Sequence, residues 1–228
     1  MSQLEDVRRL SHMMEAWTSL VGQRESEIVS TWTADLIGMM DARHKIVTAG
    51  GWAAGPSTLM GVLDLQRAEV ANCSIVRWLL DPLARHGIGV RMVSRLADRL
   101  GLSIAEPSTF RAAAEVVRPQ SRADVVLTSA STTIVIEAKI DAPEGPTQAA
   151  RLEDDWPPPA SLVFLTVSGG ILPRTAQEAD RWKPLSWSWI AGAALEAMEE
   201  TPRPTDHRGV EAQQTVMTWI SDVERYLR

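Results

Sequence analysis

The chain has 228 residues, of which 45% are hydrophobic and 23% charged, enough for one well-buried soluble domain with an appended helical piece. No apolar run approaches the roughly 20 residues of a membrane span, and the charged N-terminus lacks the apolar stretch of a signal peptide. A single cysteine excludes a disulfide framework. We therefore expect a cytoplasmic protein with no membrane partner. A net charge of −6 argues against a surface that binds nucleic acid nonspecifically. The stretch from residue 77 to residue 122 nevertheless contains eight arginines and only four acidic residues.

Two helices are predicted in the N-terminal part of the chain, at residues 4–20 and 25–47, because apolar residues recur there at helical spacing. The second carries a stripe of tryptophan, leucine and methionine, which is typical of core packing rather than of a cofactor site. This stripe consists of Trp32, Leu36, Met39 and Met40. The glycine-rich segment at residues 50–56 indicates a boundary, so we expect a helical extension over residues 1–56.

A further helix is predicted from Ser57 or Thr58, either of which can cap it, through Asn72. It carries Glu69, and a lone helical glutamate is most often solvated. A short buried helix should follow at residues 74–80 and end at the Asp-Pro pair after it.

The next predicted helix, at residues 90–100, is amphipathic, and Arg91, Arg95 and Arg99 recur on one of its faces. Two interpretations stay open for these arginines. They form a solvated face, or they form a ridge that follows phosphates, because a guanidinium donates in a fork that suits phosphate oxygens. On the second interpretation they bind nucleic acid together with Arg122.

The chain is centred on a β-hairpin predicted over residues 122–139, in which two apolar runs flank a short turn of Ser, Ala and Thr. If the hairpin is symmetric about Ala130–Ser131, Asp124 lies opposite Glu137, and Lys139 shares the face of Glu137. Like charges directly opposite each other destabilise a sheet, and a bound divalent cation would relieve the repulsion. The alternative is an exposed strand end with an ordinary Glu–Lys pair.

The remaining elements surround this hairpin, with a strand before it and alternating helices and strands after it. They are a strand at 111–118, a helix at 147–156 capped by Thr147, a buried strand at 161–167, an extended segment at 182–187 leading into a helix to about residue 199, and a last helix at 210–227. The last helix has an apolar stripe that packs either on the domain or on a second copy of the chain, so a homodimer stays open. That stripe consists of Val216, Trp219, Ile220, Val223 and Leu227.

The central residues resemble the signature of the PD-(D/E)xK nuclease superfamily, in which an aspartate on one strand is followed by Glu-x-Lys on the next. Asp124, Glu137 and Lys139 match it. Glu69, with the segment NCSIVRWLLDPLARHGIG after it, is similar to the upstream part of one bacterial branch of that superfamily. Gln148 in GPTQAARLEDDW resembles the glutamine that opens the helix after the catalytic strand. The resemblance extends to about residue 189.

The resemblance implies an α/β fold of the restriction-endonuclease-like type, a mixed β-sheet flanked by helices with extra helices at both ends. We therefore expect a single nuclease-like domain over residues 1–228, with the core at 57–200 and the C-terminal helix within 201–228. Phage defence is one biological context open to such a protein, alongside restriction, repair and mobile elements.

The resemblance also implies a divalent-metal-dependent nuclease that hydrolyses phosphodiester bonds, an endonuclease rather than an exonuclease, with DNA favoured over RNA. Mg²⁺, or Mn²⁺ in its place, would be held by Asp124 and Glu137, with Glu69 completing the shell. Lys139 would orient or help deprotonate a water, and Gln148 would position that water or a phosphate.

Two other interpretations compete with the nuclease. One is a catalytically silent nuclease-fold module that binds nucleic acid or acts as a scaffold; the intact Asp/Glu/Lys set argues against it. The other is a small-molecule α/β enzyme, for which the chain lacks a glycine-rich cofactor fingerprint.

Overall fold

A computed structural model describes the backbone of residues 2–51 and 55–227 and the side chains of residues 8–51 and 55–227. The chain divides into two units, residues 1–55 and 56–228. Among the described residues no helix is both long enough and apolar enough to cross a bilayer.

The first unit consists of one continuous helix, α1 (Ser2–Thr48), and not of the two helices predicted. No proline interrupts this stretch, and Gly22, near the expected break, costs a helix only about 1 kcal/mol. The Met/Trp stripe, expected to be core packing, is not packed within this unit, where Trp32 is 75% exposed and Met39 is 69% exposed. Side-chain periodicity predicts which face of a helix is apolar but not what covers that face.

The second unit contains a five-stranded mixed sheet with the strands in chain order. The strands are β1 (Arg111–Val117), β2 (Arg122–Thr128), β3 (Thr133–Ala138), β4 (Ser161–Thr166) and β5 (Trp182–Ser186). β1, β2 and β3 are antiparallel neighbours, whereas β3, β4 and β5 run parallel. The expected mixed α/β architecture is confirmed, and the extended segment at 182–187 supplies a fifth strand that pairs with β4.

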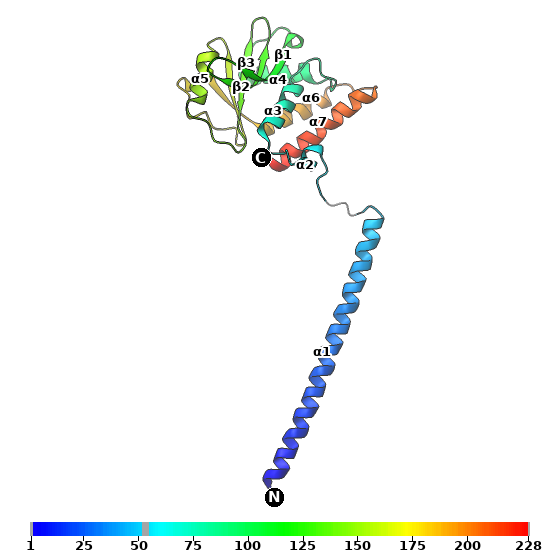
Figure 1. Cartoon of the computed structure of the whole chain (residues 1–228). Coiled ribbons are helices and arrows are strands. Elements are labelled where there is room, and N and C mark those ends of the chain that lie inside the picture. The colour runs from blue at the N-terminus through cyan, green and yellow to red at the C-terminus, as the bar shows by residue number, and fades with distance from the viewer. Residues whose placement is uncertain (1, 52–54, 228) are drawn as a thin grey trace. The chain divides into compact units, whose positions relative to one another are not determined.

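Helices cover both faces of the sheet (Figure 1). The helices of the second unit are α2 (Leu59–Val62), α3 (Glu69–Leu79), α4 (Gly89–Leu100), α5 (Gln148–Asp155), α6 (Trp187–Glu199) and α7 (His207–Tyr226), with short 3₁₀ turns η1 (Pro107–Thr109) and η2 (Ala179–Arg181). The helix predicted through Asn72 is therefore wrong. Thr58 caps only α2, Asp64 then adopts a left-handed backbone (φ 55°), and a new helix begins at Glu69.

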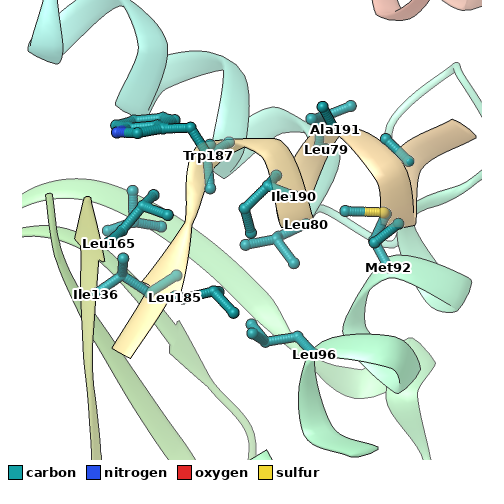
Figure 2. Close-up of a cluster of buried hydrophobic side chains, with 14 of the residues drawn as sticks. Leu79, Leu80, Met92, Leu96, Ile136, Leu165, Leu185, Trp187, Ile190 and Ala191 are labelled. Carbon is teal, nitrogen blue, oxygen red and sulfur yellow. The ribbon is translucent and has the colours of Figure 1, made fainter. Parts of the chain in front are cut away.

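Side chains alternate between the two faces of the central strands, as the period of two predicts. Ile134, Ile136 and Ala138 belong to the larger core, which α3, α4, α6 and α7 complete (Figure 2). Val135 lies in the smaller core on the other face, against α5. Because Glu137 follows the same alternation as Val135, it lies on the α5 side of β3.

The apolar stripe of the last helix packs within the second unit, where Val216, Val223 and Leu227 are fully buried. The indole Nε1 of Trp219 also donates to Asn72 Oδ1 at 2.9 Å. The stripe is thus used inside one chain, and it gives no support to a dimer formed through this helix.

Candidate active site

The predicted hairpin register is confirmed. Val125 pairs with Ile136 and Thr128 with Thr133, which leaves residues 129–132 as the turn and sets Asp124 opposite Glu137. Asp124 is nearly buried, and its Oδ2 accepts a hydrogen bond from the backbone N–H of Ala138 at 2.8 Å. The strand pairing therefore fixes the two carboxylates at the same end of β2 and β3.

Glu137 is 1% exposed, and its two carboxylate oxygens have different surroundings. Oε1 accepts from Lys139 Nζ at 2.7 Å and from the side-chain amide of Gln148. Oε2 is buried and has no hydrogen-bond partner among the described residues. A buried carboxylate oxygen without a donor is costly, so this atom favours a proton or a cation beside it.

Lys139 follows directly after β3, and its Nζ contacts three groups of the site. Besides Glu137, the ammonium donates to the carbonyl of Ala138 at 2.8 Å and to Glu69 Oε1 at 3.4 Å. The side chain is only 13% exposed, so the positive charge is largely withdrawn from water and directed at the acids.

Glu69 reaches the site from the first residue of α3. Its Oε2 accepts from the backbone N–H of Ile140 at 3.1 Å, so both of its oxygens face donors. An ion pair between Arg67 and Asp141 ties the loop before α3 to the loop after β3, which explains how residues so distant in sequence meet. Glu69 thereby braces the Lys139 segment.

The first turn of α5 brings Gln148 beside Glu137. Its Oε1 accepts from the backbone N–H of Gly145 at 3.0 Å, which orients the amide so that Nε2 donates to Glu137. The Thr175 hydroxyl accepts from the N–H of Ala149 at 2.9 Å and anchors the helix start. Thr147 occupies the cap position, but its side chain makes no capping bond, because its backbone is left-handed (φ 60°).

Burial dominates the electrostatics of the acids. It raises the pKa of Glu137 to about 8, with a further contribution from Asp124 that Lys139 only partly offsets. Burial likewise raises the pKa of Asp124. For Lys139 burial acts in the opposite direction, yet the neighbouring Glu137 and Glu69 carboxylates leave its pKa above the ordinary value. Both acids are thus more readily protonated in the folded chain than in water.

A polar hollow of about 360 Å³ opens beside these residues, with Asp124, Lys139, Gln148 and Glu69 in its wall. Three arginines complete the wall, and they are Arg118, Arg122 and Arg151. The turn that carries Arg118 is fixed by Asp155, which accepts from Gln120 N at 3.0 Å and from Ser121 Oγ at 2.7 Å.

Sequence reasoning identified Arg122 but missed Arg118 and Arg151. The Arg118 guanidinium stacks 4.2 Å from the ring centre of Trp156, which holds it in place. Arg151 lies three residues after Gln148 on α5, a spacing that puts both side chains on one helix face. This three-residue spacing from Gln148 was the feature of the sequence that could have identified Arg151 as a site residue.

Two of the three arginines of the predicted ridge on α4, Arg91 and Arg95, pair with acids outside the hollow. Arg95 forms ion pairs with Glu196 at 2.5 Å and with Glu200 at 2.6 Å, and Arg91 lies 3.7 Å from Glu200. These acids belong to or directly follow α6, which contacts α4, so Arg91 and Arg95 are joined to acidic partners, and neither lines the hollow.

Glu115, on β1, is a further acid close to the site. The β1–β2 register sets it opposite Asp124, and its backbone is left-handed (φ 53°), which is rare for a residue other than glycine. Its Oε2 pairs with Arg122 Nε at 2.9 Å, whereas its Oε1 is buried without a partner in the described part of the chain. Glu115 therefore fixes Arg122 and adds negative charge near Asp124.

A hard divalent cation fits the donor chemistry of this site in part. Asp124 and Glu137 offer carboxylate oxygens, and the partnerless Oε2 of Glu137 is the atom that a cation would satisfy. Among the described residues, however, no group of three or more His, Cys, Asp or Glu side chains is arranged to hold a metal ion. Two carboxylates would thus be the protein's contribution, since Glu69 is committed to Lys139 and Ile140.

Comparisons with protein families, with curated proteins and with solved structures found no match to this chain. Its site is therefore defined by its own geometry: two buried carboxylates, a lysine and a glutamine at one strand end, beside a hollow walled by arginines.

Proposed function

We propose that this chain is a divalent-metal-dependent nuclease with a restriction-endonuclease-like core, which hydrolyses phosphodiester bonds within DNA. One observation carries the proposal. Glu137 is buried beside Asp124 with one oxygen lacking any partner among the described residues, and Lys139 and Gln148 converge on its other oxygen. A purely structural carboxylate would have both oxygens satisfied, as Glu153 has.

The hollow beside the acids supports an anionic substrate. Arg118, Arg122 and Arg151 line it, and guanidinium groups bind phosphate oxygens in a forked geometry. The acids lie deeper than these arginines, Glu137 being buried. A phosphodiester that contacts the arginines would therefore present its phosphorus toward Lys139 and Gln148.

Each residue of the site has a role in this proposal. A divalent cation bound by Asp124 and Glu137 would polarise a phosphoryl oxygen and acidify a water. The Lys139 ammonium would offset the negative charge that develops on the phosphate, and it would orient the attacking water. The Gln148 amide, already oriented by Gly145, would hold that water or a non-bridging oxygen.

The direct test is cleavage of labelled duplex DNA, single-stranded DNA and RNA, each with Mg²⁺, with Mn²⁺ or with EDTA. We expect cleavage of DNA that EDTA abolishes and that Asp124→Asn reduces by at least about 100-fold. Asp154→Asn is the matched control, because Asp154 is exposed on α5 and outside the hollow. Absence of cleavage of every substrate would contradict the proposal.

A binding measurement separates the enzyme from the silent module. Mg²⁺ or Mn²⁺ should raise the melting temperature of the wild type by mass action, and Asp124→Asn should lose most of that rise. Because this substitution also removes one charge of a repelling pair, the variant should be at least as stable as the wild type in EDTA. A protein that binds DNA without metal-dependent stabilisation or cleavage would be the silent module.

A further inference from the structure

Within the first unit, an extensive apolar stripe along α1 is covered by no other described residue of that unit. Its members recur at helical spacing over residues 10–21 and again over residues 28–39, and each is more than a third exposed. They include Leu10, Met13, Trp17, Leu20, Val21, Ile28, Val29, Trp32, Leu36 and Met39. The surface is hollowed between Ile28, Trp32 and Met39, so it has shape as well as apolar character.

A long helix with such an apolar stripe is expected to bury that stripe against another surface. In water most of the stability of a protein helix comes from packing an amphipathic face and not from intrinsic propensity. Trp17 is 70% exposed and Trp32 is 75% exposed, and tryptophan is among the side chains that contribute most to buried interfaces. The exposed stripe is therefore an interaction surface.

The charges of α1 indicate the class of partner. The helix carries seven acidic and five basic residues. Helices that lie on membrane surfaces are rich in lysine and arginine on their polar face, so a mixed and slightly acidic helix does not fit an anionic lipid surface. A partner with the same mixture of apolar and paired charged residues does fit.

We propose that the partner is a second copy of α1, packed antiparallel, with the two-fold axis between Arg24 and Glu25. This arrangement sets apolar residues opposite apolar residues along the whole stripe. The facing pairs are Leu10 with Met39, Met13 with Leu36, Trp17 with Trp32, Leu20 with Val29, and Val21 with Ile28. Each pair occurs twice, as two-fold symmetry requires.

The charged residues decide between antiparallel and parallel packing. Arg24 and Glu25 lie at the middle of the apolar stretch, and in the antiparallel pair each Arg24 faces the Glu25 of the other copy. Arg8 likewise faces Asp41. In a parallel pair Arg24 would face Arg24 and Glu25 would face Glu25, which sets like charges together at the centre of the interface.

The first test is the mass of the full chain in solution, by sedimentation equilibrium or light scattering. We expect twice 25.0 kDa at micromolar concentration. Trp17→Glu should weaken the dimer by at least about tenfold, because it buries a charge against Trp32. Gln23→Glu is the matched control: it adds the same charge on the opposite face of the helix and should leave the dimer intact. A monomer at all concentrations would overturn the proposal.

Charge exchange at the axis tests the orientation. Arg24→Glu alone sets glutamates opposite glutamates and should weaken the dimer, and adding Glu25→Arg should restore it. In a parallel pair the double variant would again set like charges opposite each other, as in the wild type. Adding Glu25→Arg to Arg24→Glu would then not raise the affinity of the dimer. Failure of the double variant to recover the affinity would contradict the antiparallel arrangement.

Disulfide trapping provides an independent readout of orientation, and the only native cysteine, Cys73, is buried and does not compete. Leu10→Cys and Met39→Cys chains should form a disulfide when mixed and oxidised, whereas neither should cross-link to itself. The two positions are 29 residues apart on α1, about 43 Å along the helix, so self-cross-linking of either variant would mean parallel packing. A mixture that forms no cross-link would overturn the proposal and mean that another partner covers the stripe.

Discussion

At Glu137 one carboxylate oxygen accepts two hydrogen bonds, the other accepts none from the described residues, and this asymmetry governs the chemistry of the whole site. The occupied oxygen positions Lys139 and Gln148 relative to each other. The partnerless oxygen, buried beside Asp124, holds the site in a state that a proton or a cation stabilises. Glu137 thus positions two side chains of the site, and its second oxygen is the atom that the proposed cation would contact.

Lys139→Met tests the role of the lysine within the proposed reaction. The variant keeps both carboxylates, so Mg²⁺-dependent stabilisation should persist, while the loss of an ammonium beside the phosphate should reduce cleavage by at least about 100-fold. Lys183→Met is the matched control, because Lys183 is an exposed lysine of β5. If both variants cleave equally well, Lys139 serves only the fold.

Glu137 also predicts how stability depends on pH. Its pKa is about 8 in the folded protein against an ordinary value of 4.5, so the folded state binds the proton more tightly than the unfolded state does. The free energy of unfolding in EDTA should therefore fall as the pH rises from about 4.5 to about 8, by about 1.4 kcal/mol at most for each pKa unit. Asp124, whose pKa is also raised, contributes with the same sign.

Denaturant titrations at pH values of about 5.5 and about 8 measure the free energy of unfolding near the two ends of this interval and check the expectation. Glu137→Gln removes the ionisation and should retain more stability at the higher pH than the wild type, whereas Asp154→Asn should keep the wild-type slope. A wild type that becomes more stable over this interval would show that Glu137 is ionised and neutralised by its neighbours.

Two helix starts and one turn assemble the site around the strand ends. The first residue of α3 supplies Glu69, the first turn of α5 supplies Gln148, and the turn before β2 carries Arg118. Each is fixed by its own hydrogen bonds, for example the N–H of Ile140 to Glu69 and the side chain of Asp155 to the turn. These hydrogen bonds matter for the proposed reaction, because it would require Lys139 and Gln148 to be held in a defined geometry.

Substituting the arginines of the hollow and substituting those of α4 should have different effects on the salt dependence of DNA binding. Arg118→Ser with Arg151→Ser should reduce the slope of log affinity against log salt by roughly 0.9 for each phosphate that these guanidinium groups neutralise. Arg91→Ser with Arg95→Ser should leave the slope unchanged, because those guanidinium groups already pair with Glu196 and Glu200. Binding of a short DNA duplex, measured at several salt concentrations, distinguishes the two surfaces. A slope that changes with the α4 substitutions and not with those in the hollow would mean that DNA binds along α4.

For the whole molecule, the division at residue 55 predicts that α1 is dispensable for the core. The sheet and the helices on both of its faces lie within residues 56–228, and their buried side chains form two cores without α1. A chain of residues 56–228 should therefore unfold cooperatively with a melting temperature close to that of the intact protein, while losing self-association. Aggregation or loss of near-ultraviolet circular dichroism in this fragment would show that α1 contributes to the core.

The hairpin, the opposition of Asp124 and Glu137, and the face that each central strand presents to each core could all be predicted from the amino-acid sequence. These features follow from a period of two and a short turn, which are local properties of the chain. The contact of Glu69 with Lys139, the ion pair of Arg95 with Glu196, and the shared hollow of Arg118 and Arg151 became visible only in the folded chain. Those pairings join residues up to about a hundred positions apart, so they depend on how helices pack on the sheet, which no local pattern encodes.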